Sequence, residues 1–373
     1  MKFTINKNEL LKSLNIVTKA ISSKNVIPIL NGIMFNLKNN GLELTASDSE
    51  LTIKTFIDKD NIVNIEKTGS VIVPSKYILD IIRKMPSDEI NFELFEGYKL
   101  KIYTDMNNYN LNCFDANEFP AIKIEESKTP LNFLIKDFKK IVEQTVFAIS
   151  NQELRPLLTG VNFHIINNIM EVVATDSYRL AKKTVKLEKK VNDEINIIVP
   201  GKNLIELIKT FDNLENNIEI HIFNNKIIFK FDNVLFQSNL LNGTYPNTAN
   251  LIPNEFEITT NVDVSNFNAS IDRASLLTQG KDKNVVIMNI KNNNMLITSY
   301  ASELGKVEEK LVVEASDKAD ISISFSAKYM MDALKTFDDE KILILLNSDV
   351  KPIVLKSVEN DDLIQLILPI KTY

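Results

Sequence analysis

The chain has 373 residues, a formal net charge of −6 and a hydrophobic fraction of 44%. These values are ordinary for a globular protein of about two or three domains, so they exclude disorder as its overall state. The single cysteine, Cys113, excludes an internal disulfide framework and structural zinc sites that need two or more thiolates. We therefore expect a reducing, cytoplasmic location.

The amino-terminal segment MKFTINKNELLKSL lacks the continuous apolar stretch of a signal peptide. No segment approaches the roughly 18 consecutive apolar residues that favour a membrane helix. We therefore expect neither a secretion signal nor contact with a membrane. The negative net charge also argues against a uniformly basic nucleic-acid-binding protein, although charge can be segregated onto one face.

Three similar segments, 73–86, 199–212 and 325–338, start 126 residues apart. Such a period is too long for a solenoid repeat and suits a tandem domain. We therefore predict three copies of one domain, with boundaries at 1–127, 128–253 and 254–373.

Each copy shows the same order of elements. In the first copy, a short strand precedes a predicted helix over 8–21, and alternating apolar and polar residues then predict antiparallel strands. A second helix follows a Val-Pro pair, in which proline suits the first helical turn. Two helices and many short strands per copy predict an α+β fold with helices on one face of antiparallel sheet. The further strands and the second helix of the first copy are expected at 32–39, 41–47, 74–86, 89–97 and 98–104.

The second helix of the first copy has an apolar stripe that we expect to pack on the sheet, made of Tyr77, Ile78, Ile81, Ile82 and Met85.

The opposite, polar face of this helix carries Lys76, Asp80 and Arg83. One interpretation is a solvated face with ion pairs between residues four apart. The alternative is a shared task, which is favoured because the trio recurs at the same spacing in the other two copies. These recurrences are Lys202, Glu206 and Lys209, and Lys328, Asp332 and Lys335.

Charge is divided unevenly between helices and the rest of the chain. The predicted helical segments with their following loops carry +6 together, which leaves −12 for the remainder. A mildly positive face on an acidic body suits loose, sequence-independent contact with a phosphate backbone. The segments summed are 7–24, 74–86, 136–155, 200–212, 264–283 and 326–339.

Signals of catalysis are missing from the sequence. His164 and His221 lie in apolar alternating segments, where ordinary strand histidines are expected. No HExxH, GxGxxG, Walker A or GxSxG motif occurs. A Ser-His-Asp set could still assemble in space, but nothing favours one. We expect no enzyme activity, no metal and no cofactor.

Several strips of sequence, in order along the whole chain, resemble the bacterial DNA polymerase III β subunit, the family of replicative sliding clamps. The strips are MKFTI, SSKNVIPIL, TVFAIS, ELRPLLTGVNF, ATDSYRLA, IIVPGKNLIEL, LLNGTYPNT, LIP, IDRASLL, SFSAKYMMDALK and QLILPIKTY.

The resemblance implies a head-to-tail homodimeric ring of six domains that encircles double-stranded DNA. It implies a non-catalytic accessory subunit of the DNA polymerase III holoenzyme, a processivity factor in DNA replication. The implied partners are the polymerase III catalytic subunit, the clamp loader, and other polymerases and repair proteins that bear clamp-binding peptides. The alternative is a protein-interaction scaffold that never encircles DNA.

The resemblance also implies a partner-peptide cleft between the second and third domains. A competing interpretation is that TDSYRL is simply a strand-to-turn element, like TASDSEL (45–51) in the first copy. The cleft residues implied by position are Thr175, Ser177, Tyr178, Arg179, Leu180, Pro246, Leu251, Leu366, Leu368, Pro369 and Ile370.

Two further surfaces follow from the resemblance. The expected DNA-facing residues are Lys24, Lys76, Arg83, Arg155, Lys202, Lys209, Lys281, Lys283, Lys328 and Lys335. The expected dimer contact pairs Tyr109 and Leu111 of one subunit with Leu276 and Leu277 of the other. Lys24 and Lys371 stand where the family pattern leads us to expect arginine, and lysine keeps the charge but loses bidentate phosphate geometry.

Overall fold

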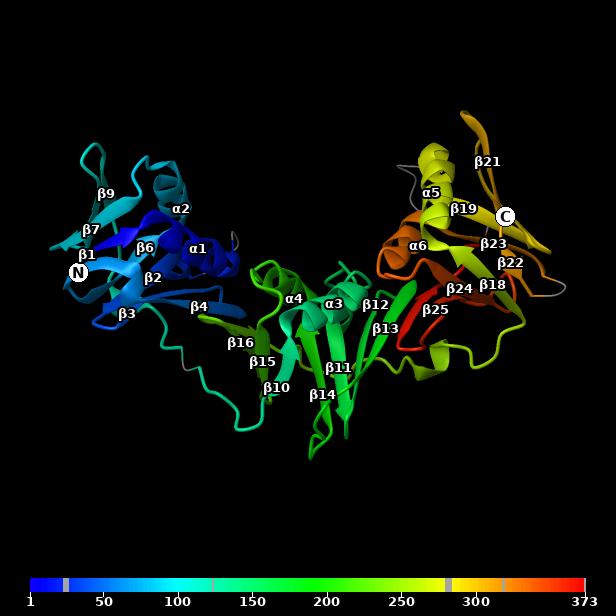
Figure 1. The fold of residues 1–373 in the computed structure, drawn as a ribbon, viewed down its shortest axis with the longest axis horizontal. Helices are drawn as coiled ribbons and strands as arrows, with labels where there is room; N and C mark the ends of the chain where they lie inside the picture. Colours follow the sequence, from blue (N-terminus) through cyan, green and yellow to red (C-terminus); the bar gives the residue numbers. More distant parts are fainter. Residues whose placement is uncertain (23–26, 123, 279–283, 317–318, 372–373) are drawn as a thin grey trace. The chain divides into compact units, whose positions relative to one another are not determined.

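A computed structural model describes residues 1–22, 27–122, 124–278, 284–316 and 319–371 (Figure 1). Its contacts divide the chain into two compact units. Unit 1 is residues 1–138 with 206–240, and unit 2 is residues 139–205 with 241–373. The division runs through the central repeat and crosses α3 (Ile135–Val146) and α4 (Gly201–Ile208).

Unit 1 contains two antiparallel sheets. The five-stranded sheet has the order β5-β1-β7-β8-β9. Its strands are β1 (Lys2–Asn6), β5 (Ile62–Lys67), β7 (Glu89–Phe95), β8 (Lys99–Tyr103) and β9 (Asn108–Asn112).

The eight-stranded sheet of unit 1, with the order β10-β15-β16-β17-β4-β3-β2-β6, combines strands from two repeats. The junction is the antiparallel pair β17–β4, in which Val234 stands opposite Thr55. Its strands are β2 (Gly32–Lys38), β3 (Gly41–Ser47), β4 (Leu51–Asp58), β6 (Gly69–Pro74), β10 (Leu131–Leu134), β15 (Asn217–Ile222), β16 (Lys226–Phe231) and β17 (Val234–Asn239).

Two helices of the first repeat lie side by side in unit 1 (Figure 1). Helix α1 (Lys7–Val17) begins at Asn6, whose side chain accepts a hydrogen bond from the Asn8 N–H. It packs against β3 and β4 through Leu10, Leu14 and Val17. Helix α2 (Ser75–Lys84) packs against β2 and β6.

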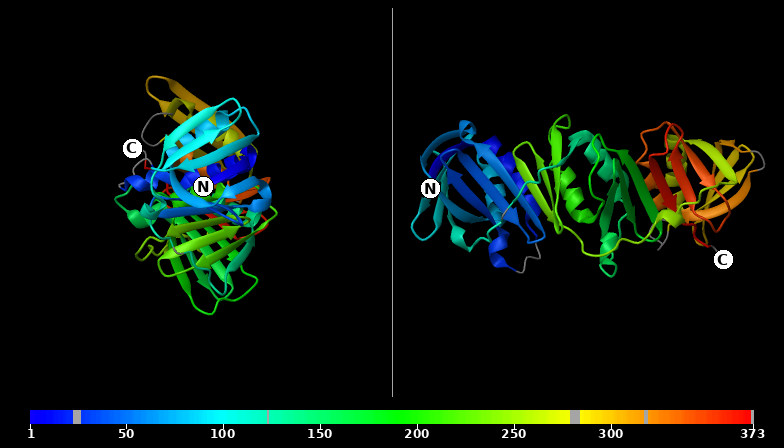
Figure 2. Two further views of the ribbon diagram at one scale, coloured as in Figure 1. Left: turned by 90° about the vertical axis from the view of Figure 1, so that its left-hand side faces the viewer. Right: turned by 90° about the horizontal axis from the view of Figure 1, so that it is seen from below.

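Unit 2 repeats the same architecture. Its nine-stranded sheet has the order β14-β11-β12-β13-β26-β25-β24-β18-β22, and the pair β13–β26 joins the central repeat to the last one. Figure 2 shows these strands, dark green and red, running side by side. The strands are β11 (Gly160–Ile166), β12 (Ile169–Thr175), β13 (Arg179–Lys186), β14 (Ile195–Pro200), β18 (Ile258–Asp263), β22 (Glu314–Ala315), β24 (Lys341–Leu346), β25 (Ile353–Ser357) and β26 (Leu363–Ile367).

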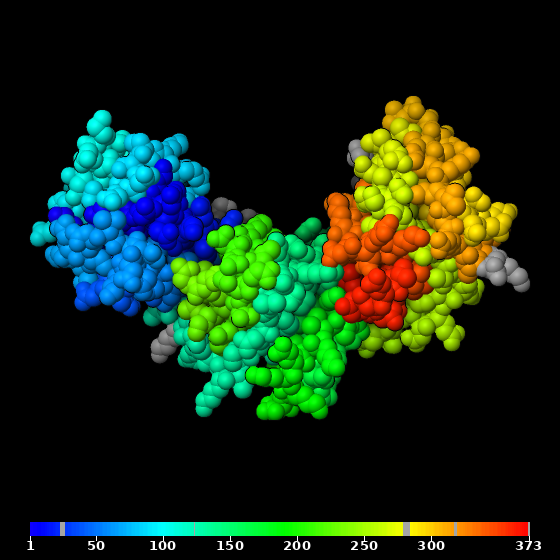
Figure 3. All heavy atoms as spheres, viewed as in Figure 1, coloured from blue at the N-terminus to red at the C-terminus, as the bar shows by residue number. Residues whose placement is uncertain are grey.

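A four-stranded sheet with the order β21-β20-β19-β23 completes unit 2. Helix α5 (Val264–Ser275) and helix α6 (Ala327–Leu334) bury Phe267, Ile271 and Met330 in the core of the last repeat. In the space-filling view, the atoms of α6 (orange) and β26 (red) lie next to each other at the surface (Figure 3). The strands are β19 (Val285–Lys291), β20 (Asn294–Ala301), β21 (Gly305–Val312) and β23 (Asp320–Ser326).

The α+β class and the antiparallel sheets are confirmed. The first helix ends at Val17 rather than at residue 21, because a short 3₁₀ turn, Thr18–Ala20, follows it. The predicted apolar stripe of α2 was wrong at Tyr77. Ile78 and Ile82 are fully buried, whereas Tyr77 is 53% exposed and its ring centroid lies 5.1 Å from Lys76 Nζ.

Among the described residues, the structure contains no helix that is both long enough and apolar enough to span a membrane.

Candidate functional site

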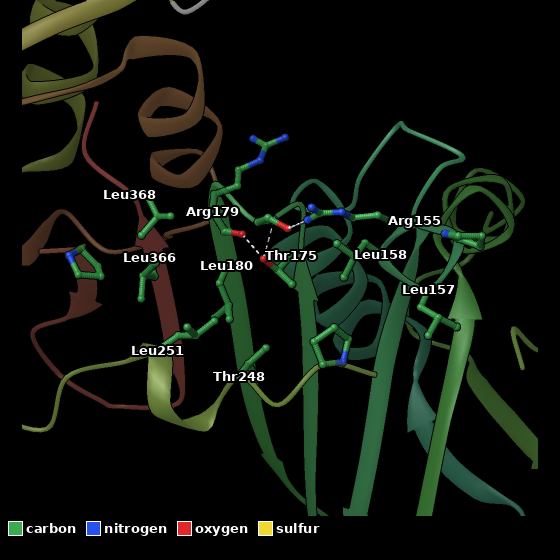
Figure 4. A pocket seen from close by; sticks show the side chains of 14 residues that line it. Arg155, Leu157, Leu158, Thr175, Arg179, Leu180, Thr248, Leu251, Leu366 and Leu368 are labelled. Carbon is green, nitrogen blue, oxygen red and sulfur yellow. Dashed lines mark hydrogen bonds between the residues drawn. The ribbon is translucent and has the colours of Figure 1, made fainter. Parts of the chain in front are cut away.

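An apolar cavity of about 510 Å³ opens in unit 2, beside the strand pair β13–β26 (Figure 4). It receives side chains from the start of β13, from the segment before β11, from the connection before β18 and from the C-terminal strand. The lining residues are Arg155, Pro156, Leu157, Leu158, Thr175, Ser177, Arg179, Leu180, Pro246, Thr248, Leu251, Pro352, Leu366 and Leu368.

The floor of the cavity is a buried apolar cluster built by both repeats. Leu180 of β13 and Leu366 of β26 stand opposite each other across the sheet and are 2% and 3% exposed. Leu158 and Val354 belong to the same cluster. A concave apolar surface with a few polar groups at its edge suits a ligand with apolar side chains.

A tight turn between β12 and β13 forms one side of the cavity. Asp176 Oδ1 accepts hydrogen bonds from the N–H groups of Tyr178 and Arg179, at 2.9 and 3.0 Å. Thr175 Oγ1 accepts one from the Ser177 N–H and donates one to the Arg179 carbonyl oxygen. These bonds hold Ser177 at a φ of 77°.

The first repeat forms the same turn. Ser49 has a φ of 80°, and Asp48 Oδ1 accepts hydrogen bonds from the N–H groups of Glu50 and Leu51. The aspartate and the serine therefore build the turn in both copies, as the strand-to-turn interpretation expected. What the second copy adds is Arg179 and Leu180 at the edge of an apolar cavity.

Tyr245 holds this turn through a hydrogen bond to its backbone. Its hydroxyl oxygen accepts a hydrogen bond from the Thr175 N–H at 3.1 Å. The side chain is 8% exposed, and burial raises the pKa of Tyr245 to about 12. The neutral phenol therefore remains in the buried cluster beneath the cavity at physiological pH, with its hydrogen bond to the turn.

The structure brings together most, but not all, of the cleft residues implied by the resemblance. Tyr178, Pro369 and Ile370 lie outside the lining. Tyr178 is 60% exposed, and its carbonyl oxygen accepts a hydrogen bond from the Leu368 N–H. The residues that do line the cavity are Thr175, Ser177, Arg179, Leu180, Pro246, Leu251, Leu366 and Leu368.

Sequence reasoning missed several lining residues. Arg155, expected to face DNA, lies on the edge of the cavity, where its Nη1 donates a hydrogen bond to Ser177 Oγ at 2.8 Å (Figure 4). Leu157 and Leu158 follow in a 3₁₀ turn, Pro156–Thr159. Their strip, ELRPLLTGVNF, was among those that carried the resemblance, so it was the available signal. Pro352 and Thr248 had no comparable signal.

The remaining expected DNA-facing residues are exposed where the structure describes them. Lys76 and Arg83 lie on α2, Lys202 on α4 and Lys328 on α6. Lys209 and Lys335 directly follow their helices. Ion pairs form between residues three apart, Asp80–Arg83 at 3.4 Å and Glu206–Lys209 at 2.8 Å, rather than four apart. Lys24, Lys281 and Lys283 lie outside the described residues.

The expected dimer residues lie at the surfaces of their own units. In unit 1, Tyr109 and Leu111 belong to β9, the outermost strand of its sheet in the described chain, and Tyr109 is 38% exposed. In unit 2, Leu276 and Leu277 lie in a short 3₁₀ turn after α5, and Leu276 is 59% exposed.

One group of side chains in the described residues has ligand atoms close enough for a metal ion: Glu126, Glu219 and His221. Its geometry does not suit a metal. Lys230 Nζ lies 2.8 Å from Glu126 Oε1 and lowers the pKa of that carboxyl. The Ser127 N–H donates to His221 Nδ1 at 3.0 Å, so the neutral ring carries its proton on Nε2, which then has no free lone pair.

Fold and cavity together define a class: a tandem-domain α+β protein with an apolar cavity beside the strand pair that joins its last two repeats. Comparison with known proteins extends this. Residues 1–123, 133–247 and 249–371 match the N-terminal, central and C-terminal domains of the DNA polymerase III beta subunit.

Full-length relatives agree. The chain is 38% identical to the beta sliding clamp of Staphylococcus aureus, with both chains fully covered. Crystal structures of the DNA polymerase sliding clamp from Bacillus subtilis and of the DNA polymerase III beta chain from Streptococcus pneumoniae superpose with TM-scores of 0.97 and 0.94. Their identities are 37% and 34%, again over all of each chain.

The chain therefore belongs to the DNA polymerase III beta subunit family, the sliding clamps of DNA polymerase. The prediction of three tandem clamp domains is confirmed, as is the main functional interpretation, a sliding clamp in DNA replication. The scaffold alternative is not favoured. The boundaries at residues 127 and 253 remain a prediction.

Proposed function

We propose that two copies of this chain close head to tail into a ring around double-stranded DNA, and that the ring acts without catalysis as a processivity factor in the cytoplasm. The observation that carries the proposal is a recurrence. Lys76, Lys202 and Lys328 occupy one position in three repeats, and each is exposed on a helix. Exposed cations spaced along helices give weak contacts with phosphates, which permit sliding because no base is read.

The apolar cavity beside β13–β26 is proposed to hold short peptides of partner proteins. The partners are the catalytic subunit of DNA polymerase III, the clamp loader, and other polymerases and repair proteins. Support comes from the exposed apolar groups on the lining: Leu251 is 49% and Leu368 38% exposed, so an apolar side chain in the cavity removes both from water.

Ring closure is proposed to use unsatisfied sheet edges. β9 ends one sheet of unit 1, and β21 ends the four-stranded sheet of unit 2 in the described chain. Outermost strands present unpaired N–H and C=O groups, which favour pairing with another chain. The turn with Leu276 and Leu277 packs against β21, so these leucines would enlarge the same contact.

The decisive experiment asks whether binding is topological. The protein is loaded onto nicked circular DNA by a bacterial clamp loader with ATP, the complex is isolated, and the circle is then cut once. We expect retention on the circle and loss after cutting, because a ring slides off a free end. Equal retention on linear DNA would refute the ring.

The scaffold alternative predicts no retention on circular DNA together with normal peptide binding. Failure to load is therefore interpreted only after loaders from two species have been tried, since a mismatched loader gives the same result.

A further inference from the structure

Asparagine is followed directly by glycine at several points of the chain. Such a pair can deamidate spontaneously, because glycine has no side chain to hinder attack of its backbone nitrogen on the asparagine amide, and its backbone is conformationally permissive. The glycine nitrogen must be free to turn toward the asparagine side chain, so the surroundings of each glycine decide which pair reacts. The sequence contains three such pairs: Asn31–Gly32, Asn40–Gly41 and Asn242–Gly243.

The first two pairs are held in the sheet of the first repeat. Gly32 is buried, and its N–H donates a hydrogen bond to the Ile29 carbonyl oxygen. Gly41 is also buried, and it pairs with Lys38 of β2 on one side and with Asp58 of β4 on the other. A nitrogen fixed in this way reaches the preceding side chain only when the sheet opens locally.

The third pair lies in an open segment between two anchors. The Leu241 N–H donates to a carbonyl oxygen of β14 at 2.9 Å, and the next anchor is the hydroxyl of Tyr245 in its hydrogen bond to the turn. Residues 242–244 are all exposed. Within the described part of the chain, neither the Asn242 side chain nor the Gly243 N–H has a hydrogen-bond partner. This pair is therefore free to react without any opening of a sheet.

The reaction needs only water as a co-reactant. The backbone nitrogen of Gly243 loses its proton and attacks Asn242 Cγ, so that an N–Cγ bond forms, the Cγ–Nδ2 bond breaks and ammonia leaves with the proton. Water then opens the cyclic succinimide. Opening at Cγ gives aspartate, whereas opening at the backbone carbonyl gives isoaspartate, in which the main chain runs through the former side chain. No group is oxidised or reduced.

The isoaspartate product would change the wall of the apolar cavity. Gly243 packs against Leu157, since a Cβ built on Gly243 would lie 3.0 Å from each of its methyl carbons, and Leu157 lines the cavity (Figure 4). The same segment continues into Tyr245, which holds the turn, and Pro246, which lines the cavity. Because isoaspartate adds a carbon to the main chain, these residues must shift relative to Leu157.

We propose that Asn242 is a site of spontaneous deamidation, and that its isoaspartate product lowers the affinity of the cavity for partner peptides. The site itself stands on the geometry of the Asn-Gly pair, whereas the effect on affinity rests on the proposed function of the cavity. Affinity then falls with the age of each molecule, at a rate set by its own backbone.

The site is tested by incubating the full-length protein at mildly alkaline pH in oxygen-18 water, followed by proteolysis and mass spectrometry. Deamidation at Asn242 should be faster than at Asn31 or Asn40 by about tenfold or more, because those two pairs must first break at least one backbone hydrogen bond. In urea-unfolded protein the three rates should become similar. Equal rates in the native protein, or an unreactive Asn242, would overturn the assignment.

The effect on the cavity is tested by fluorescence anisotropy with a short fluorescein-labelled peptide that carries leucine and phenylalanine anchors. Aged protein should bind more weakly than fresh protein by about threefold to tenfold, a common size for coupling through packed side chains. The matched control is Asn242→Gln, which should keep its affinity on ageing because glutamine cyclises far more slowly. Freshly purified Asn242→Asp carries the new charge on an unchanged main chain, and it should bind as fresh wild type does.

Unchanged affinity of aged wild type that contains isoaspartate would overturn the second half of the proposal. So would an equal loss in aged Asn242→Gln, since that result means general damage. If fresh wild-type protein does not bind the peptide, the proposed peptide site fails and the effect on affinity fails with it, while the deamidation rates still decide the site.

Discussion

The two leucines on the rim of the cavity offer the sharpest test of the peptide site. Leu251 and Leu368 both line the cavity, and they are 49% and 38% exposed in the free chain. Fully burying a leucine side chain contributes about 1.5–3 kcal/mol. Covering the exposed remainder therefore contributes about 0.7–1.5 kcal/mol at Leu251 and about 0.6–1.1 kcal/mol at Leu368.

The double variant Leu251→Ala with Leu368→Ala should consequently lose affinity for the labelled peptide by about tenfold, with about eightyfold as an upper limit because alanine retains its Cβ. The assay is fluorescence anisotropy with a short fluorescein-labelled peptide that carries leucine and phenylalanine anchors, supported by isothermal titration calorimetry. Both single variants are measured as well, since the two side chains face one cavity and their effects need not add.

Leu214→Ala is the matched control, because Leu214 is 36% exposed but belongs to unit 1 and is not among the residues that line the cavity. It should bind the peptide as the wild type does. If the double variant also retained wild-type affinity, the leucines would not be covered on binding, and the assignment of the cavity would be wrong.

Three further predictions address other parts of the molecule. Leu276→Asp with Leu277→Asp should give monomers by light scattering, because two charges then enter the proposed dimer contact; a persistent dimer would place the contact elsewhere. Burial raises the pKa of Tyr245 from 10.0 to about 12, so its neutral form contributes stability that is complete below pH 10 and lost as the pH rises toward 12. Urea unfolding should show a loss of roughly 2–3 kcal/mol across this window that is absent in Tyr245→Phe, and identical alkaline slopes would contradict the burial argument. Burial likewise raises the pKa of the Cys113 thiol from 9.0 to about 12. Alkylation by iodoacetamide at pH 8 should therefore be roughly a thousandfold slower in the native than in the unfolded protein, and equal rates would show an accessible thiolate.

Patterns local to one repeat were readable from the sequence. The alternation over 41–47 predicted β3 with its observed bounds, and the Val-Pro pair placed the start of α2 within a residue. The burial of Tyr77 was predicted wrongly, because helical periodicity places this residue only at the edge of the apolar stripe. At that edge a long amphipathic side chain can point to solvent, and the Tyr77 ring contacts Lys76.

Features that depend on pairing between repeats were not readable. Arg155 was predicted to face DNA because the sequence shows its charge. Its hydrogen bond to Ser177 depends on the tertiary structure, which the sequence pattern does not show. Pro352 precedes β25, and it meets the cavity only because β25 pairs with β26. A repeated sequence pattern does not indicate which strand edges of neighbouring repeats pair. In the structure these pairs are β17 with β4 and β13 with β26.

Each large sheet combines strands of two repeats, so a single repeat cannot be cut from the chain without breaking a sheet. A cut after the first repeat would remove β17 from β4 and leave Leu51, Ile53 and Thr55 on a freshly exposed strand edge. Such an edge is a template for aggregation. The unit that recurs in the sequence is therefore not the unit that can be produced alone: a soluble fragment of the amino-terminal half has to bring β15, β16 and β17 with it, which requires a chain break inside the central repeat.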